Sequence, residues 1–416
     1  MTAQRVLFGI AVVVVSLLLF GRKTPAAERP LPAVAVTTMN WLRGLAAVAV
    51  LVGHVRGLFM QDYEALESKS AAWKAFYLLS GLGHQAVIVF FVLSGFLVGA
   101  SVLARQQVNG RWDFRDYFTR RLVRLYVVLI PGLLLTAAWD AAGLRLFGAE
   151  GLYGGALDAR HLTMPDVRVT LSLEHFLGNL AFLQHIFIAP FGTNGPLWSL
   201  SYEFWAYLLF PLLVRAGGTA EKPVTRAVYG LLATLIIVGG GLKLAFYFSI
   251  WLVGAGLALW WLRTAWRPAR PITIAALACL FAGALVVGRS SRLSDSVADV
   301  ILAATTAALL AAVLTLPDRM PKRALSRANA SGADWLAGFS YTLYVAHYPV
   351  LAFLFVATMG GVRWAASAQA VLAVLAISLG VLLLYAFPLS RLTEAHTDSL
   401  RRRLSRPRPK VGQAAA

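Results

Sequence analysis

Long apolar runs recur along the whole chain, separated by short polar or basic stretches. A helix needs about 20 consecutive apolar residues to cross the hydrocarbon core of a bilayer, and most of these runs approach or exceed that length. Such runs predict helices, because every backbone polar group in lipid must be satisfied internally. We therefore predict an all-α, polytopic integral membrane bundle. The runs occupy residues 6–20, 39–59, 84–104, 122–140, 172–190, 197–215, 226–242, 244–262, 271–288, 298–316, 335–358 and 367–388.

Composition agrees with a membrane protein and argues against nucleic-acid binding. Hydrophobic residues make up 59% of the 416 residues and charged residues 14%, against about 25% charged residues in soluble domains. The net charge of +19 comes from basic residues between apolar runs and near the C-terminus, where topology signals lie. The one cysteine, Cys279, excludes an intramolecular disulfide. We expect no nucleic-acid partner, no metal and no bound cofactor.

Lysine and arginine orient the predicted bundle, because cytoplasmic loops carry an excess of them. The mixed-sign stretches at 60–83, 141–171 and 289–297 are expected outside. The loop charges alternate without conflict if 39–59 runs from inside to outside and 172–190 is a non-spanning helix on the outer side. The basic stretches expected inside are 105–124, 263–270, 319–327 and the tail. The prediction is ten core spans after residue 38, with the tail in the cytoplasm.

The first apolar run, 6–20, has three interpretations: an extra span, a signal peptide, or an extension upstream of a start at Met39. We favour an uncleaved extra helix. The predicted organisation is then a hydrophobic segment and linker at 1–38, a membrane domain at 39–390 and a basic cytoplasmic tail at 391–416. No polar stretch can hold a separate catalytic domain, so any chemistry is expected within the bundle.

Two ionisable residues lie in the run 39–59, where insertion into lipid costs roughly 2.5–3.5 kcal/mol each. Arg43 and His54 are separated by 54 − 43 = 11 positions, which returns within about 20° of the same helix face at an axial offset of about 16 Å. We expect both to face one cavity. The alternative is that Arg43 reaches the inner headgroups and His54 makes an interhelical hydrogen bond.

Further polar residues lie in three other predicted spans. The stretch 338–350 places Tyr341, Tyr344 and His347 three residues apart, along neighbouring faces of one helix. Packing explains the tyrosines, whereas a histidine in mid-membrane favours function. Ser94 begins a small pair that permits close helix packing. The stretch that opens the run 197–215 contributes Asn194, Trp198, Ser199, Ser201 and Glu203. Glu203 is either functional or a carboxylate at headgroup level.

Arg120, Arg121 and Arg124 begin the span at 122–140 from its cytoplasmic side. Anchoring of topology is one explanation. The other is a clamp for an anionic ligand, since guanidinium groups match the geometry of phosphate.

Taken in order, these motifs resemble membrane acyltransferase family 3. The motifs are "LRGLAAVAVLVGH", "FFVLSGFLV", "RRLVRLY", "PLWSLSYEFWAYLLFPLL" and "SYTLYVAHYPV". The resemblance runs from about Met39 to Pro388, and arginine followed by histidine after ten residues is the signature of the family's first core helix. It implies ten core helices and transfer of an acyl group, usually acetyl, from cytoplasmic acyl-CoA to a hydroxyl presented across the membrane. Acceptors in the family are sugars of surface or secreted glycans and, in some members, antibiotics or other small molecules.

The chain departs from the family pattern at several positions. Ile88 stands where many members have an aspartate, and Phe204 stands where a second acidic residue is frequent. Many members have a proline soon after the arginine-rich motif. Here Val127 follows the tyrosine of that motif, and the first proline is Pro131. No extra-membrane esterase-like domain follows the bundle, so the bundle is expected to complete the transfer itself.

The resemblance and the chemistry of acyl transfer together suggest roles. An unperturbed imidazole titrates near pH 6.5, so His54 is expected to be the general base, although a transient acyl-imidazole would suit the same position. Arg43 would position the donor, acetyl-CoA. Arg120, Arg121, Arg124 and Ser94 are the remaining donor-site candidates. The acceptor-site candidates are Glu203, His347, Trp198, Ser199, Ser201, Tyr341, Tyr344 and Asn194.

Two rival functions remain open at this stage. A transporter or flippase of a glycan or small anion would also bury ionisable residues, although the chain lacks the internal duplication that many transporters show. A transporter would not consume acetyl-CoA, whereas the enzyme would release the free CoA thiol. A non-catalytic scaffold for glycan assembly is the third possibility, and it predicts that His54 and Arg43 tolerate alanine.

Overall fold

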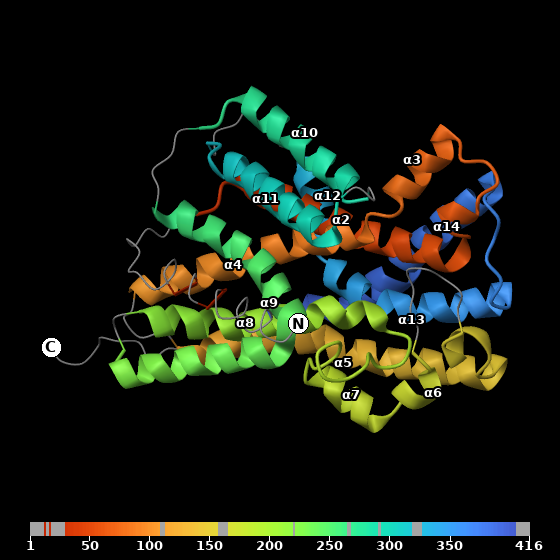
Figure 1. Ribbon diagram of the computed structural model, residues 1–416, viewed down its shortest axis with the longest axis horizontal. Coiled ribbons are helices and arrows are strands. Elements are labelled where there is room, and N and C mark those ends of the chain that lie inside the picture. Colours follow the sequence, from red (N-terminus) through yellow and green to blue (C-terminus); the bar gives the residue numbers. More distant parts are fainter. Residues whose placement is uncertain are drawn as a thin grey trace.

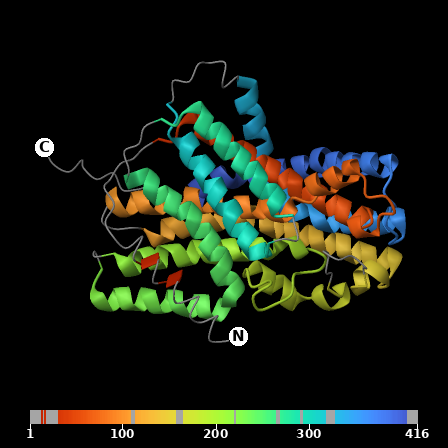
Figure 2. The same ribbon diagram turned by 45° about the horizontal axis from the view of Figure 1, so that its top comes forward.

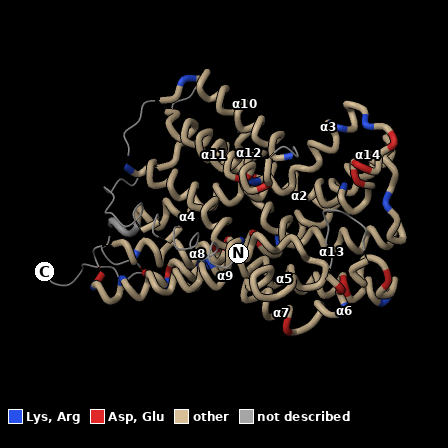
Figure 3. The backbone as a smooth tube through the Cα atoms, viewed as in Figure 1, with Lys and Arg blue, Asp and Glu red and all other residues tan. Residues whose placement is uncertain are grey.

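The computed structural model describes residues 12–13, 16–17, 30–108, 113–156, 165–218, 221–263, 268–289, 293–317 and 327–404. Within these ranges the chain is helical, without a β-strand (Figure 1). Eight helices are long and apolar enough to cross a membrane, and the shorter helix α10 (Pro271–Val287) is also apolar. Lysine, arginine, aspartate and glutamate lie mainly at helix ends and in connections (Figure 3). The predicted all-α integral membrane bundle is therefore confirmed.

The long helices form the body of the molecule, and short ones connect them. α2 is central and packs against α4, α12 and α13, while α13 also packs along α5. α10 and α11 lie side by side in both views (Figures 1 and 2). The long helices besides α10 are α2 (Ala33–Phe59), α4 (Gly83–Val108), α5 (Phe114–Phe147), α8 (Trp198–Gly217), α9 (Pro223–Arg263), α11 (Asp295–Leu314), α13 (Ser340–Met359) and α14 (Ala368–Gly380). The short helices are α3 (Ala71–Leu79), α6 (Val167–Thr170), α7 (Leu173–Leu180), α12 (Arg327–Ala337), α15 (Phe387–Leu392) and α16 (Thr397–Leu404).

The helix α9 consists of two arms that meet at a kink. Gly241 at the kink has a φ of 77°, which is not helical and which glycine adopts without steric cost. The predicted runs 226–242 and 244–262 correspond to the two arms. The second arm lies against α4 so closely that a Cβ on Gly254 would come within 2.0 Å of the backbone oxygen of Val92. Small residues permit such contacts between helices in lipid.

The segment 172–190 does not span the bundle. Only Leu173–Leu180 is α-helical, so the helix is shorter than predicted, and turns follow in which Phe182 and His185 have positive φ. Asn179 holds this connection by donating from Nδ2 to the backbone oxygen of Ala189 at 3.1 Å. Polar side chains in this segment thus serve hydrogen-bonded turns, and the prediction of a non-spanning segment is confirmed.

The two ends of the chain are described in part. Residues 12, 13, 16 and 17 are helical, and most of the predicted extra helix at 6–20 lies outside the described residues, as does the tail after Leu404. Helix α2 begins at Ala33, before the predicted start of the membrane domain. Beyond residue 390 the chain still packs on the bundle, because Glu394 accepts hydrogen bonds from the backbone and side chain of Thr342, both at 3.0 Å.

Candidate active site

A pair of histidines joins α2 to α13. His54 Nδ1 lies 2.8 Å from His347 Nε2. His347 Nδ1 lies 2.9 Å from the backbone oxygens of both Leu343 and Tyr344. A carbonyl oxygen only accepts hydrogen bonds, so Nδ1 of His347 must carry a proton, and Nε2 of the neutral ring must accept. His54 therefore donates from Nδ1, and its own Nε2 keeps a lone pair that no described residue occupies.

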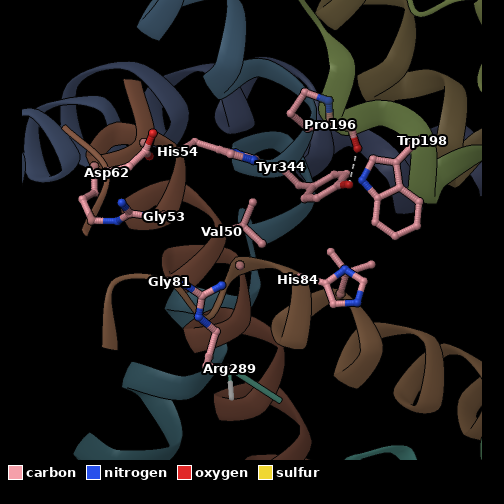
Figure 4. Close-up of a pocket in the computed structure, with 14 residues that line it drawn as sticks. Val50, Gly53, His54, Asp62, Gly81, His84, Pro196, Trp198, Arg289 and Tyr344 are labelled. Atoms are coloured by element: carbon pink, nitrogen blue, oxygen red, sulfur yellow. Dashed lines mark hydrogen bonds between the residues drawn. The ribbon is translucent and has the colours of Figure 1, made fainter. Parts of the chain in front are cut away.

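His54 lines a cavity of about 280 Å³, which we call the His54 cavity. Its wall comes from α2, α4, α8, α13 and the end of α10, and Figure 4 shows His54, Tyr344 and Trp198 on one side with His84 and Arg289 on another. Arg56 also lines this cavity. The imidazole ring of His54, whose Nε2 is free to accept a proton, thus borders a space large enough for a small ligand.

Arg43 lines a second, smaller cavity of about 60 Å³, which we call the Arg43 cavity. Arg43 Nη2 donates to the backbone oxygen of Ala337 at 2.8 Å, and its buried Nε has no hydrogen-bond partner among the described residues. Arg124 and Glu203 share this cavity. Two guanidinium groups and one carboxylate therefore line this cavity, and Glu394 lies near both arginines without lining it. The guanidinium groups are the donors available to an anionic ligand here.

Tyr344 lines both cavities and lies between them. Its hydroxyl donates to the backbone oxygen of Pro196 and lies 2.6 Å from Ser199 Oγ, which therefore donates to it. The prediction that Arg43 and His54 face one cavity is wrong in this respect: two adjoining cavities replace it. The offset of about 16 Å along α2 leaves room for a tyrosine from α13 to enter between them.

Only one arginine of the predicted donor clamp reaches a cavity. Arg124 lines the Arg43 cavity. Arg120 instead forms an ion pair with Asp116 one turn earlier. The guanidinium of Arg121 lies over two tyrosine rings, with centroids 5.5 Å away in each case. Arg121 points away from Arg120 because adjacent positions on a helix do not share a face. Arg120 and Arg124 are one turn apart, and the ion pair with Asp116 holds Arg120 away from the cavity that Arg124 lines.

Two residues predicted on the acceptor side do not line the His54 cavity. Glu203 lines the Arg43 cavity, where its Oε1 accepts a hydrogen bond from Ser94 Oγ at 2.8 Å. Ser94 also accepts from Trp251 Nε1 at 3.2 Å. His347 contacts His54 rather than the His54 cavity, which it does not line. The cavity that Glu203 borders and the residue that His347 contacts depend on the rotations of α8 and α13, which the sequence does not specify.

Of the six other predicted acceptor residues, Tyr344 and Trp198 line the His54 cavity, and the remaining four have structural contacts. Ser199 lies against Tyr344, and Tyr341, which lines the Arg43 cavity, donates to the backbone oxygen of Leu125 at 3.1 Å. Ser201 donates to the backbone oxygen of Phe182 at 2.8 Å. Asn194 donates to Thr136 Oγ1 and to the backbone oxygen of Val345, both at 3.0 Å.

Several cavity residues were not predicted from the sequence. His84 Nε2 lies 2.9 Å from both carboxylate oxygens of Asp299, and its ring is nearly parallel to that of Trp198 at 6.3 Å. Arg56 and Arg289 also line the His54 cavity. A signal existed, because Asp299 is a carboxylate inside an apolar run and His84 opens another. In the part of the chain that the structure describes, no three His, Cys, Asp or Glu residues gather as metal ligands.

The helical membrane bundle and its two cavities define a class of integral membrane protein with polar groups buried at its centre. Residues 36–387 match the family model described as an acyltransferase domain, that of acyltransferase family 3. The chain therefore belongs to membrane acyltransferase family 3, as its motifs indicated. No solved structure matches it significantly.

Relatives within this family carry names of acyl-transferring enzymes. The chain is 27% identical over 300 residues to YrhL of Bacillus subtilis, provisionally named a peptidoglycan O-acetyltransferase, a match that covers 65% of this chain and 44% of the relative. It is 30% identical over 209 residues to the acyltransferase MdmB of Streptomyces mycarofaciens, covering 49% and 46%. It is 29% identical over 170 residues to an O-acetyl transferase of Shigella phage Sf6, covering 40% and 42%. The match thus spans less than half the length of these relatives.

Proposed function

We propose that this protein is an O-acyltransferase of a bacterial plasma membrane. It would transfer an acyl group, acetyl by analogy with its relatives' names, from cytoplasmic acyl-CoA to a hydroxyl of a cell-surface or exported glycan. The observation that carries the proposal is the unoccupied lone pair on His54 Nε2, fixed by His347 at the wall of a cavity. A base must present such a lone pair to remove a hydroxyl proton.

The proposed topology places the two cavities on the two sides of the membrane. Counting the arms of α9 separately and including α10 turns the eight candidate spans into ten. The loop charges then orient α2 with Ala33 inside and Phe59 outside. On this topology the Arg43 cavity lies in the cytoplasmic half and receives the donor, and the His54 cavity lies in the outer half and receives the acceptor.

The reaction is a transfer between a thioester and an alcohol. The acceptor oxygen forms a bond to the acyl carbon, the C–S bond to CoA breaks, and the hydroxyl proton moves to His54 Nε2. The CoA thiolate leaves and takes up a proton. Arg43 and Arg124 would bind anionic or polar groups of the donor, and Trp198 would offer a flat face to a sugar. Tyr344 must move aside for the acyl group to reach His54.

The test is release of CoA thiol by the purified full chain in lipid nanodiscs, with a colorimetric thiol reagent. With acetyl-CoA and a glycan acceptor, His54→Ala should lower the rate by about 10²–10⁴-fold, which is the usual contribution of a general base. His396→Ala is the matched control, because His396 is exposed and lines neither cavity. Normal transfer by His54→Ala would remove His54 from the mechanism. A transporter would release no thiol at all.

A further inference from the structure

The His54 cavity carries two arginines that the proposed reaction does not use. Arg56 lies on α2 two residues beyond His54, and Arg289 follows the end of α10, so the two reach the cavity from different parts of the fold. Figure 4 shows Arg289 with its guanidinium directed toward Gly81 at the cavity wall. Neither arginine forms an ion pair with a residue that the structure describes. The proposed base His54 does not need two arginines beside it, so their presence in this cavity requires a separate explanation.

Arg56 is buried but only partly satisfied. Its side chain is 8% exposed, and its Nε has no hydrogen-bond partner in the described chain. Its guanidinium lies 5.0 Å from the centre of the Tyr77 ring, which gives a cation–π contact but no hydrogen bond. A buried cation without hydrogen bonds is costly, and this cost falls when an anion accepts from the guanidinium.

Arg289 lies close to the turn that contains Gly81. A Cβ on Gly81 would lie 3.0 Å from both Cζ and Nη2 of Arg289. The absence of a side chain at Gly81 leaves room for the guanidinium at this position. Unlike Arg56, Arg289 is exposed, so it can contact a ligand that enters from the surface.

The acidic residues around the cavity already have basic partners. Asp62, which lines the cavity, forms an ion pair with Arg363 at 3.0 Å. Asp299 is paired with His84. Among the described residues that line the His54 cavity, two arginines therefore face one aspartate that already has a partner. Glu64 lies with both arginines in a neighbouring cavity and does not line this one. The lining carries a net positive charge that a bound anion would balance.

We propose that the acceptor carries an oxyanion, a carboxylate or a phosphate, which Arg56 and Arg289 bind while its hydroxyl lies at His54. This inference rests on the proposed function, because it names the substrate class of the same site. The acceptor class is then an acidic sugar or a sugar phosphate rather than a neutral glycan. Guanidinium groups bind both oxyanions with two parallel hydrogen bonds.

The experiment measures binding and does not depend on catalysis. The full-length His54→Ala protein in nanodiscs is titrated with methyl β-glucoside, methyl β-glucuronide or glucose 6-phosphate at constant ionic strength, and thermal unfolding reports the Kd. At least one anion should bind about tenfold or more tightly than the neutral glucoside, as expected for charge-assisted hydrogen bonds. The preferred anion identifies carboxylate or phosphate as the source. Equal binding of all three sugars, or binding of none, would overturn the inference.

Substitutions then locate the anion. Arg289→Gln removes charge from an exposed side chain with little risk to folding, and it should abolish most of the preference. Arg56→Lys keeps the charge but loses the fork of donors, so an intermediate preference is expected. Arg168→Gln is the control, because Arg168 is an exposed arginine that pairs with Asp166 at 2.6 Å and does not line the cavity. An unchanged preference in Arg289→Gln and in Arg56→Gln would also overturn the inference.

Failure of the proposed function would look different. If no acceptor stimulates release of CoA thiol from wild-type protein, the acyltransferase proposal fails while the binding titration still reports on the anion site. If neutral and acidic acceptors stimulate the release of CoA thiol to the same extent, the acyltransferase proposal stands and the anion inference fails.

Discussion

Replacement of His347 tests how the catalytic base is held. During the proposed reaction His54 gains a proton and becomes cationic, and its Nδ1–H bond to His347 Nε2 becomes a hydrogen bond to a charged group. Such bonds contribute about 1.5–3 kcal/mol. If the hydrogen bond stabilises protonated His54 only in the transition state, its loss in His347→Ala should lower kcat by roughly 10–150-fold. KM for acetyl-CoA should stay nearly constant, because His347 lines neither cavity.

Two substitutions of His347 separate its role in orienting His54 from its role in packing. In His347→Gln the amide oxygen can replace Nε2 as the acceptor, so we expect recovery of most of the kcat lost in His347→Ala. The assay is initial-rate release of CoA thiol over a range of acetyl-CoA concentrations, with thermal unfolding of each variant as the check on folding. A His347→Ala protein with wild-type kcat would refute the reasoning. So would a His347→Gln protein that is folded but no better than His347→Ala.

Three further predictions concern the donor, the acceptor side and the bundle. Arg124→Gln should raise KM for acetyl-CoA at least about tenfold, because a charge-assisted contact is lost. Arg120→Gln is the control and should leave KM unchanged, because Arg120 is paired with Asp116. Equal effects of the two substitutions on KM would contradict this prediction. Asp299→Asn should lower kcat with the acceptor, because His84 loses its charged partner; an unchanged rate would exclude a role. Gly254→Ala should destabilise the protein by about 1–3 kcal/mol, since its Cβ would meet a backbone oxygen at 2.0 Å; an unchanged Tm would contradict the packing.

The sequence predicted well what depends on local pattern. Lengths of apolar runs predicted the long helices, and the alternation of loop charges predicted that 172–190 is non-spanning. The spacing of Arg43 and His54 placed both on the helix face that borders cavities. Each of these properties follows from residues close together in the chain, where helix geometry fixes their relation.

What the sequence could not predict depends on contacts between distant segments. His347 meets His54 across 293 positions of sequence, and its rotation about α13 decides whether it touches ligand or histidine. Tyr344 separates the cavities only because α8 supplies Ser199, and the turn before α8 supplies Pro196, as partners for its hydroxyl. No helical periodicity within α13 specifies which helix stands opposite. His84 was missed for the same reason, because its significance comes from Asp299 on α11.

The hydrogen bonds of Tyr344 bear on how fast the two cavities can connect. Moving the ring breaks its bonds to Pro196 and Ser199, and each such bond has a net value of about 0.5–1.5 kcal/mol. A cost of about 1–3 kcal/mol leaves the displaced state populated at roughly 1–20%. The barrier for a typical turnover of 1–10³ s⁻¹ is about 13–17 kcal/mol. Displacement of Tyr344 would therefore account for about 1–3 kcal/mol of such a barrier. For most of the time the ring would keep the thioester apart from water on the acceptor side.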